Sequence, residues 1–76
     1  MNFNVDVSLE CSTEEAAREV AGLMYYYGFI PEISGAVVRV IAKDIGQRTF
    51  EFLAAEIEGN ELINDRFFHI NGKNTK

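Results

Sequence analysis

The fold is decided by residues 12 to 31, which read Ser-Thr-Glu-Glu-Ala-Ala-Arg-Glu-Val-Ala-Gly-Leu-Met-Tyr-Tyr-Tyr-Gly-Phe-Ile-Pro. Ser12 and Glu15 match the Ser-x-x-Glu capping box with which many helices begin. Gly28 suits the left-handed residue that ends a helix, and Pro31 prevents continuation. Apolar residues recur between these signals at three- and four-residue steps. The stretch therefore predicts an amphipathic helix whose last turn carries three consecutive tyrosines.

The segments on either side of this helix predict strands. Asn2 to Glu10 alternates apolar with polar residues, as a strand with one buried face does. Phe29 to Ser34 predicts a short strand, and Pro31 confines it to an edge because proline donates no ladder hydrogen bond. Ser34-Gly35 predicts a turn into Ala36 to Lys43, whose β-branched residues indicate a central strand covered on both sides.

The second half predicts one further helix and one further strand. Asp44 and Gln47 form another capping box, and Gly59-Asn60 ends the helix that it begins. Phe52 falls off the apolar stripe of this helix, so we expect a partly exposed aromatic ring there. Arg66 to Asn71 predicts the last strand.

The resulting order of elements, βαββαβ, resembles the ferredoxin-like superfold over nearly the whole chain. The resemblance implies an α+β fold whose four-stranded antiparallel sheet has both helices on one face. It also implies that the Pro31 segment and the Phe67-Phe68 strand form the two edges, with the β-branched third strand inside. We expect a single ferredoxin-like domain over residues 1–71 and a flexible tail over residues 72–76.

Composition excludes several classes of function. The 76 residues contain one cysteine, which excludes an intramolecular disulfide and cysteine-based zinc or iron-sulfur sites. No apolar run reaches the roughly 18 residues that a membrane span needs, so we expect a soluble cytoplasmic protein without membrane contacts. The net charge of -5 lies entirely in residues 1–38, which hold six acids and one base. This balance disfavours nucleic acid as a direct ligand and favours a basic protein partner.

The known chemistries of this fold each lack their residues here. An RNA-recognition domain needs aromatics on its third strand, and Ala36 to Ile41 has none. An acylphosphatase-like loop needs an arginine where Glu10 to Glu14 stands. His69 has no neighbouring histidine or cysteine, and Ser12 is accounted for by its capping role. We therefore expect no enzyme activity, no catalytic residue, no cofactor and no metal.

The remaining candidates for a functional site are exposed side chains on the surface. At 100° per residue, only one or two of Tyr25, Tyr26 and Tyr27 can face the core, so Tyr26, and Tyr25 with it, should face solvent or a partner. The expected partner-binding residues are Glu14, Glu15, Glu19, Tyr25, Tyr26, Glu51, Phe52, Glu56 and Glu58. The last strand should expose an apolar edge at Phe67, Phe68 and His69, which suits a homodimer.

These features predict a stand-alone acidic protein-interaction module that binds a basic surface of a macromolecular partner. A virus-encoded inhibitor of a host nucleic-acid-binding machinery, of the anti-CRISPR kind, would have these properties. The alternative is an ACT-like homodimeric regulatory domain that binds a small ligand between its subunits, since that class has loose sequence requirements.

Overall fold

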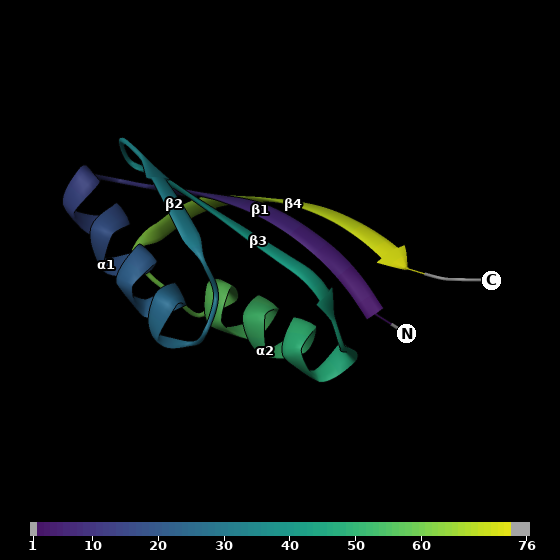
Figure 1. Cartoon of the computed structure of the whole chain (residues 1–76). Helices are drawn as coiled ribbons and strands as arrows, with labels where there is room; N and C mark the ends of the chain where they lie inside the picture. The colour runs from purple at the N-terminus through teal and green to yellow at the C-terminus, as the bar shows by residue number, and fades with distance from the viewer. Residues whose placement is uncertain (1, 74–76) are drawn as a thin grey trace.

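The computed structural model describes residues 2–73, which form four strands and two helices around one sheet. The elements are β1 (Asn2–Cys11), α1 (Glu14–Tyr26), β2 (Pro31–Ser34), β3 (Val37–Ile45), α2 (Gln47–Glu58) and β4 (Ile63–Lys73). The antiparallel sheet has the order β2-β3-β1-β4, so β2 and β4 are its edges (Figure 1). This is the predicted ferredoxin-like α+β fold.

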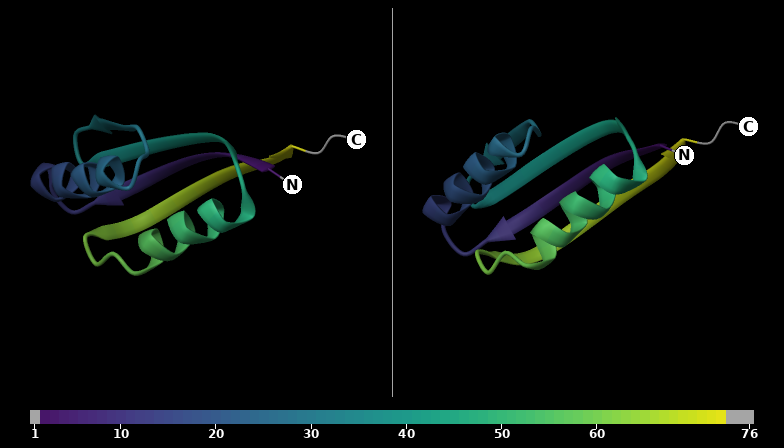
Figure 2. Two further views of the ribbon diagram at one scale, coloured as in Figure 1. Left: turned by 60° about the horizontal axis from the view of Figure 1, so that its bottom comes forward. Right: turned by 90° about the horizontal axis from the view of Figure 1, so that it is seen from below.

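The core lies between the sheet and the helices, which cover the same face (Figure 2). Every second residue of β1 points into it, from Val5 through Val7 and Leu9 to Cys11. α1 contributes Ala17, Val20, Ala21 and Met24, and α2 contributes Leu53 and Ile57. Because the helices bury these stripes on one face, the opposite face of the sheet stays open.

The open face contradicts one prediction for β3. This strand lies inside the sheet, and Val38, Val40 and Ala42 are buried beneath the helices. Arg39 and Lys43 nevertheless point to the uncovered face and are exposed. The expectation of a strand covered on both sides was wrong, because β-branched density reflects the central position in the hydrogen-bonded ladder and not a second covering layer.

The predicted cap of α1 is displaced by one residue. Thr13 is the N-cap, and its Oγ1 accepts a hydrogen bond from the Ala16 N–H at 3.0 Å. Ser12 instead accepts a hydrogen bond from Asn64 Nδ2 at 2.8 Å, across the end of the sheet. Both residues can cap a helix. The hydrogen bond with Asn64 places Ser12 at the junction between β1 and β4, so Thr13 caps the helix instead.

The cap predicted for α2 was also wrong. Gly46 is the N-cap and makes no side-chain capping bond, whereas Asp44 still belongs to β3. The carboxylate of Asp44 accepts from Asn2 Nδ2 at 2.8 Å, and its N–H donates to Asn4 Oδ1 at 2.9 Å. Asp44 has a φ of 60°, a left-handed conformation that aspartate tolerates better than most residues. These β1 contacts use the groups that a cap would need.

The remaining boundaries follow the predicted signals. Gly28 has a φ of 101° directly after Tyr27, the C-cap of α1, as expected of a glycine that ends a helix. β4 is longer than predicted at both ends and includes Gly72 and Lys73, while the rest of the expected tail, residues 74–76, lies outside the described residues. Neither helix in the described chain is long and apolar enough to cross a membrane.

Candidate protein-binding surface

The C-terminal turn of α1 presents the three tyrosines in different environments. Tyr25 and Tyr26 are 73% and 81% exposed, as the helical geometry predicts. Tyr27 is half-buried and packs against the core. Tyr27 therefore packs with the core, whereas Tyr25 and Tyr26 project outward from the end of the helix.

Tyr27 links the exposed tyrosines to α2. Its ring contacts Phe52 edge to face with 4.9 Å between centroids, and Tyr26 packs against Tyr27 at 5.7 Å. The Tyr27 hydroxyl donates to Glu56 Oε1 at 2.9 Å. That hydrogen bond, with partial burial, raises the pKa of the Tyr27 phenol. We call Tyr25, Tyr26, Tyr27 and Phe52 the aromatic end. Within it, the Tyr27 side chain is held both by the Phe52 ring and by the hydrogen bond to Glu56.

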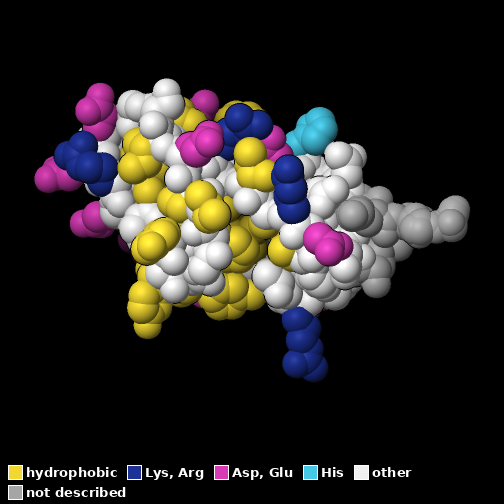
Figure 3. Space-filling model, in the orientation of Figure 1, with side chains coloured by type: hydrophobic (Ala, Val, Ile, Leu, Met, Phe, Trp, Pro, Cys, Tyr) yellow, Lys and Arg dark blue, Asp and Glu magenta, His cyan; other side chains and the backbone are white. Residues whose placement is uncertain are grey.

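The aromatic end continues onto the connection between α1 and β2. Ile30 is 74% exposed, and Ile33 of β2 is about half exposed. Figure 3 shows hydrophobic side chains gathered over the C-terminal part of α1 and over β2. We did not predict Ile30 and Ile33 as surface residues. The signal was available in Pro31, since a short edge strand leaves its flanking apolar residues without cover.

The six predicted carboxylates do not form one cluster. Glu14, Glu15 and Glu19 lie exposed on the N-terminal half of α1, with Glu14 and Glu15 in its first turn. The other three belong to α2 and have polar partners there: Glu51 accepts from Gln47 at 2.9 Å, Glu56 from Tyr27 and Glu58 from Arg66. The acids therefore form two separate groups, one toward the end of α1 opposite its tyrosines and the other along α2, which carries Phe52.

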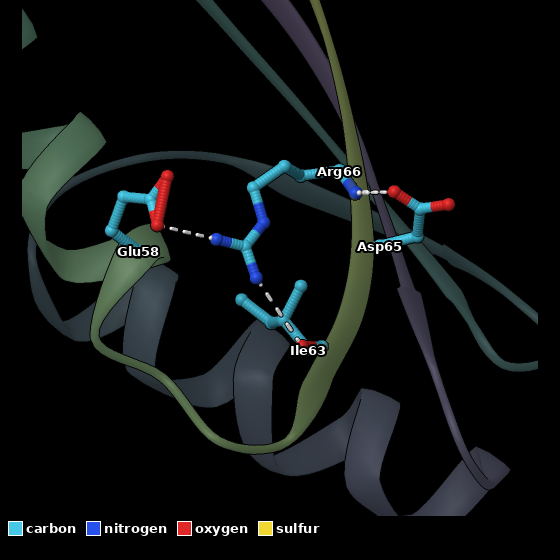
Figure 4. Close-up of polar contacts among 4 residues, drawn as sticks. All are labelled: Glu58, Ile63, Asp65 and Arg66. Atoms are coloured by element: carbon cyan, nitrogen blue, oxygen red, sulfur yellow. Dashed lines mark hydrogen bonds and ion pairs between the residues drawn. The ribbon is translucent and has the colours of Figure 1, made fainter.

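The Glu58 contact also fastens the end of α2 to the beginning of β4. Arg66 Nη1 donates to Glu58 Oε1 at 2.8 Å, and Arg66 Nη2 donates to the carbonyl oxygen of Ile63 at 3.4 Å (Figure 4). Asp65 Oδ1 accepts the backbone N–H of Arg66 at 2.9 Å. Glu58 is thus partly neutralised, which makes it a weaker contributor to a negative field than its sequence position suggests.

The open face of the sheet carries a separate polar group. Arg39 Nε and Nη2 donate to the two carboxylate oxygens of Asp6 at 2.9 and 2.6 Å. This bidentate pairing lowers the pKa of Asp6 and raises that of Arg39. His69 lies directly opposite Asp6 on the neighbouring strand. The carboxylate of Asp6 therefore balances the charge of Arg39 on this face.

The residues predicted for the dimer edge lie on β4 as expected. Phe67 stands opposite Ser8 on the open face and is 53% exposed, while Phe68 stands opposite Val7 on the helix-covered face and is partly exposed. His69 returns to the open face and is exposed. The two phenylalanines therefore leave opposite faces of the same outer strand.

The groups most often found in catalytic sites are dispersed. Within residues 2–73, no three His, Cys, Asp or Glu side chains lie close enough together to hold a metal ion. Cys11 is buried in the core, and desolvation raises the pKa of its thiol. No protein-family model matches the chain, and neither the curated proteins nor the solved structures include a significant match to it.

Proposed function

We propose that this protein is an acidic interaction module that binds a basic surface of a macromolecular partner through its aromatic end. One observation carries the proposal: Tyr26 is 81% exposed, yet its ring rests on Tyr27, which Phe52 and Glu56 hold in place. An exposed ring on a fixed support loses little conformational freedom when a partner covers it. Tyrosine is one of the residue types enriched in binding hot spots.

The charge of the surrounding surface indicates the chemistry of the partner. Glu51 and Glu56 lie on α2, the helix that carries Phe52, and Glu14, Glu15 and Glu19 add negative charge toward the other end of α1. Exposed carboxylates near an aromatic centre attract a basic surface and speed its association, while the rings exclude water from the contact. Arginine of the partner can also stack on a tyrosine ring.

The proposal extends to the biological setting. A basic protein surface of this kind occurs where a protein binds nucleic acid, and an acidic module that covers it would act as an inhibitor. A virus-encoded inhibitor of a host nucleic-acid-binding machinery, anti-CRISPR-like in its strategy, would work in this way. The lone thiol suits the cytoplasm, where thiols stay reduced.

Affinity capture with matched variants tests the proposal. The tagged protein, a Tyr25→Ala/Tyr26→Ala variant and a Phe67→Ala control would each be exposed to lysate of the organism or its host. We expect the wild type and the control to recover the same basic partner and the double variant to lose it. Capture should weaken between about 0.1 M and about 1 M ionic strength, over which the Debye length falls from about 10 to about 3 Å.

Two results would contradict the proposal. One is recovery of the same partner by the double tyrosine variant, which would place the contact elsewhere. The other is capture that does not respond to salt, which would remove the electrostatic part of the mechanism. Circular dichroism of the double variant serves as the folding control, and its spectrum should match the wild type because both side chains are exposed.

The ACT-like alternative predicts a different response. A small ligand bound between subunits at 100 times its dissociation constant stabilises the folded protein by about 2.7 kcal/mol, which a thermal-shift screen of amino acids and nucleotides detects. The interaction module responds to none of these compounds. A reproducible shift with one of them would favour the regulatory domain.

A further inference from the structure

The two edges of the sheet differ in how they discourage pairing with another strand. β2 has four residues and begins with Pro31, which has no N–H to offer. β4 has 11 residues and no proline, and β1 occupies only one of its sides. Since β4 is the last strand of the sheet, its outer backbone groups pair with no other strand of the described chain. A long edge of this kind is a template for a further strand.

The side chains of β4 limit how a second copy can pair with it. Asp65, Phe67 and His69 lie on the open face, and Arg66 and Phe68 lie on the helix-covered face. Residues directly opposite each other in an antiparallel pair project to the same face of the sheet. The two-fold axis must therefore lie between the two copies of one β4 residue, which then stands opposite itself; we call this an axis through that residue. An axis placed between two successive residues would set a residue of the open face opposite one of the covered face.

An axis through Phe67 makes the strand complementary to itself. Phe67 then stands opposite Phe67 of the second copy, and Asp65 stands opposite His69 of the second copy. Within its own chain Asp65 lies opposite Glu10, a like-charged neighbour, so a donor across the edge relieves a repulsion. A neutral imidazole can supply that donor, since one of its nitrogens carries a proton.

The covered face is complementary in the same register. Arg66 stands opposite Phe68 of the second copy, where a guanidinium can lie on the aromatic ring. The 2.8 Å contact of Arg66 with Glu58 already turns the guanidinium toward the helix side of the sheet (Figure 4). Both faces of the edge therefore gain a specific cross-strand pair from one position of the axis.

The neighbouring registers give only part of this complementarity. An axis through Phe68 sets Phe67 opposite His69 and Asp65 opposite Asn71, whose amide can donate, but it sets Arg66 opposite Ile70 and gives the base no aromatic ring. An axis through His69 sets Asp65 opposite Lys73 and Phe68 opposite Ile70, but it sets Arg66 opposite Gly72 and His69 against itself. Of the three positions, only Phe67 pairs the acid of the open face with a donor and the base of the covered face with an aromatic ring.

We propose that the protein forms a two-fold dimer by antiparallel pairing of β4 with β4 of a second copy, centred on Phe67. The dimer extends the sheet continuously through both chains and leaves the aromatic end, which belongs to the helices, free in each copy. This inference does not depend on the proposed function, because it rests on the edge strand alone.

Disulfide trapping tests the register directly. Proteins carrying Asp65→Cys and His69→Cys would be mixed in equal amounts and oxidised mildly, and covalent dimers would be counted by non-reducing electrophoresis. Directly opposite Cβ atoms lie about 4.5–5.5 Å apart, close to the separation that a disulfide needs. We expect the mixture to cross-link at least about tenfold more than either protein alone. Wild-type protein controls for Cys11, which is buried.

A mixture of Asp65→Cys with Asn71→Cys is the matched control, since it reports the register centred on Phe68. Equal or greater cross-linking in that control, or no excess in the first mixture, would overturn the proposed register. Sedimentation of the unmodified protein gives a second measurement, for which we expect twice the chain mass of 8.6 kDa. A monomer mass throughout the micromolar to millimolar range would overturn the dimer itself.

Discussion

The aromatic end and the β4 edge are both exposed and apolar, but they offer a partner different groups. Most backbone groups of α1 and α2 pair within their helices, so the aromatic end offers mainly side chains such as Tyr26. The outer side of β4 offers a row of backbone donors and acceptors in addition to Phe67. A surface of side chains can fit an unrelated protein, whereas a strand edge is matched most simply by another strand.

The two surfaces should also respond to salt in opposite directions. A basic partner is attracted by the net charge of -5, and salt screens that attraction. Two copies of the same chain repel each other through the same charge, and salt screens that repulsion. Because of this difference, salt and substitution can separate the two kinds of binding.

The largest expected effect belongs to the aromatic end. Tyr26→Ala removes a hot-spot ring, and such truncations cost 2 kcal/mol or more, which corresponds to about a 30-fold loss of affinity. Titration of the captured partner against wild type and variant measures this loss. Tyr26→Phe keeps the ring and should retain most of the affinity, so an equal loss in both variants would show that the hydroxyl, not the ring, makes the contact.

A smaller effect is expected at the other surface. Phe67→Glu places two carboxylates opposite each other at the centre of the proposed dimer and should weaken self-association at least about tenfold, since like charges directly opposite destabilise a strand pair. Sedimentation equilibrium measures the change, and partner capture through the aromatic end should be unaffected. Loss of both activities in this variant would mean that the two surfaces are coupled.

The contact between α2 and β4 should contribute modestly to stability. Glu58→Gln removes the charge of a carboxylate whose side chain is 74% exposed, so we expect a loss of no more than about 1 kcal/mol in the free energy of unfolding. Urea denaturation measures it, with Glu61→Gln as the exposed control. A loss several times larger would show that the contact between Glu58 and Arg66 holds β4 in place and contributes more than an exposed ion pair does.

The last effect, of similar size, concerns the open face of the sheet, opposite the helices. The Arg39 hydrogen bonds lower the pKa of Asp6 below its usual 3.8, so the folded state favours the ionised form. The resulting stabilisation is present above the unfolded pKa and is lost as the pH falls through the folded one. Asp6→Asn should therefore destabilise the protein slightly at pH 7, by no more than about 1 kcal/mol because the pair is exposed.

Urea denaturation of wild type and Asp6→Asn across the acid range checks this prediction. The difference between them should shrink below about pH 4, where the Asp6 carboxylate of the unfolded chain begins to gain its proton. A difference that stays constant from neutral to acid pH would show that the charge of Asp6 is not responsible. Partner capture and self-association should be unchanged at neutral pH in this variant.

The sequence predicted the order of the elements because each one carries a local signal. The alternation from Phe3 to Leu9, the glycine that ends α1 and the proline of β2 all act within a few residues, and the structure confirms them. The exposure of Tyr25 and Tyr26 could likewise be predicted from helical geometry.

What the sequence did not predict depends on contacts between distant residues. Ser12 bonds Asn64, 52 positions away, and Asp44 bonds Asn2, 42 positions away, so neither is the cap that its local pattern indicated. The support of Tyr26 likewise requires Tyr27 to meet Phe52 and Glu56, which only the packing of α1 beside α2 achieves. The exposure of Tyr25 and Tyr26 was thus predictable, but the contacts that support Tyr26 were not.

Tyrosine nitration mapped by mass spectrometry tests the role of the aromatic end most directly. In the free protein, tetranitromethane should modify the exposed Tyr25 and Tyr26 faster than Tyr27, because the hydrogen bond to Glu56 raises the pKa of Tyr27 and nitration requires the phenolate. In the complex with the captured partner, we predict that Tyr25 and Tyr26 become protected. Unchanged nitration of both residues in that complex would contradict the proposed binding surface.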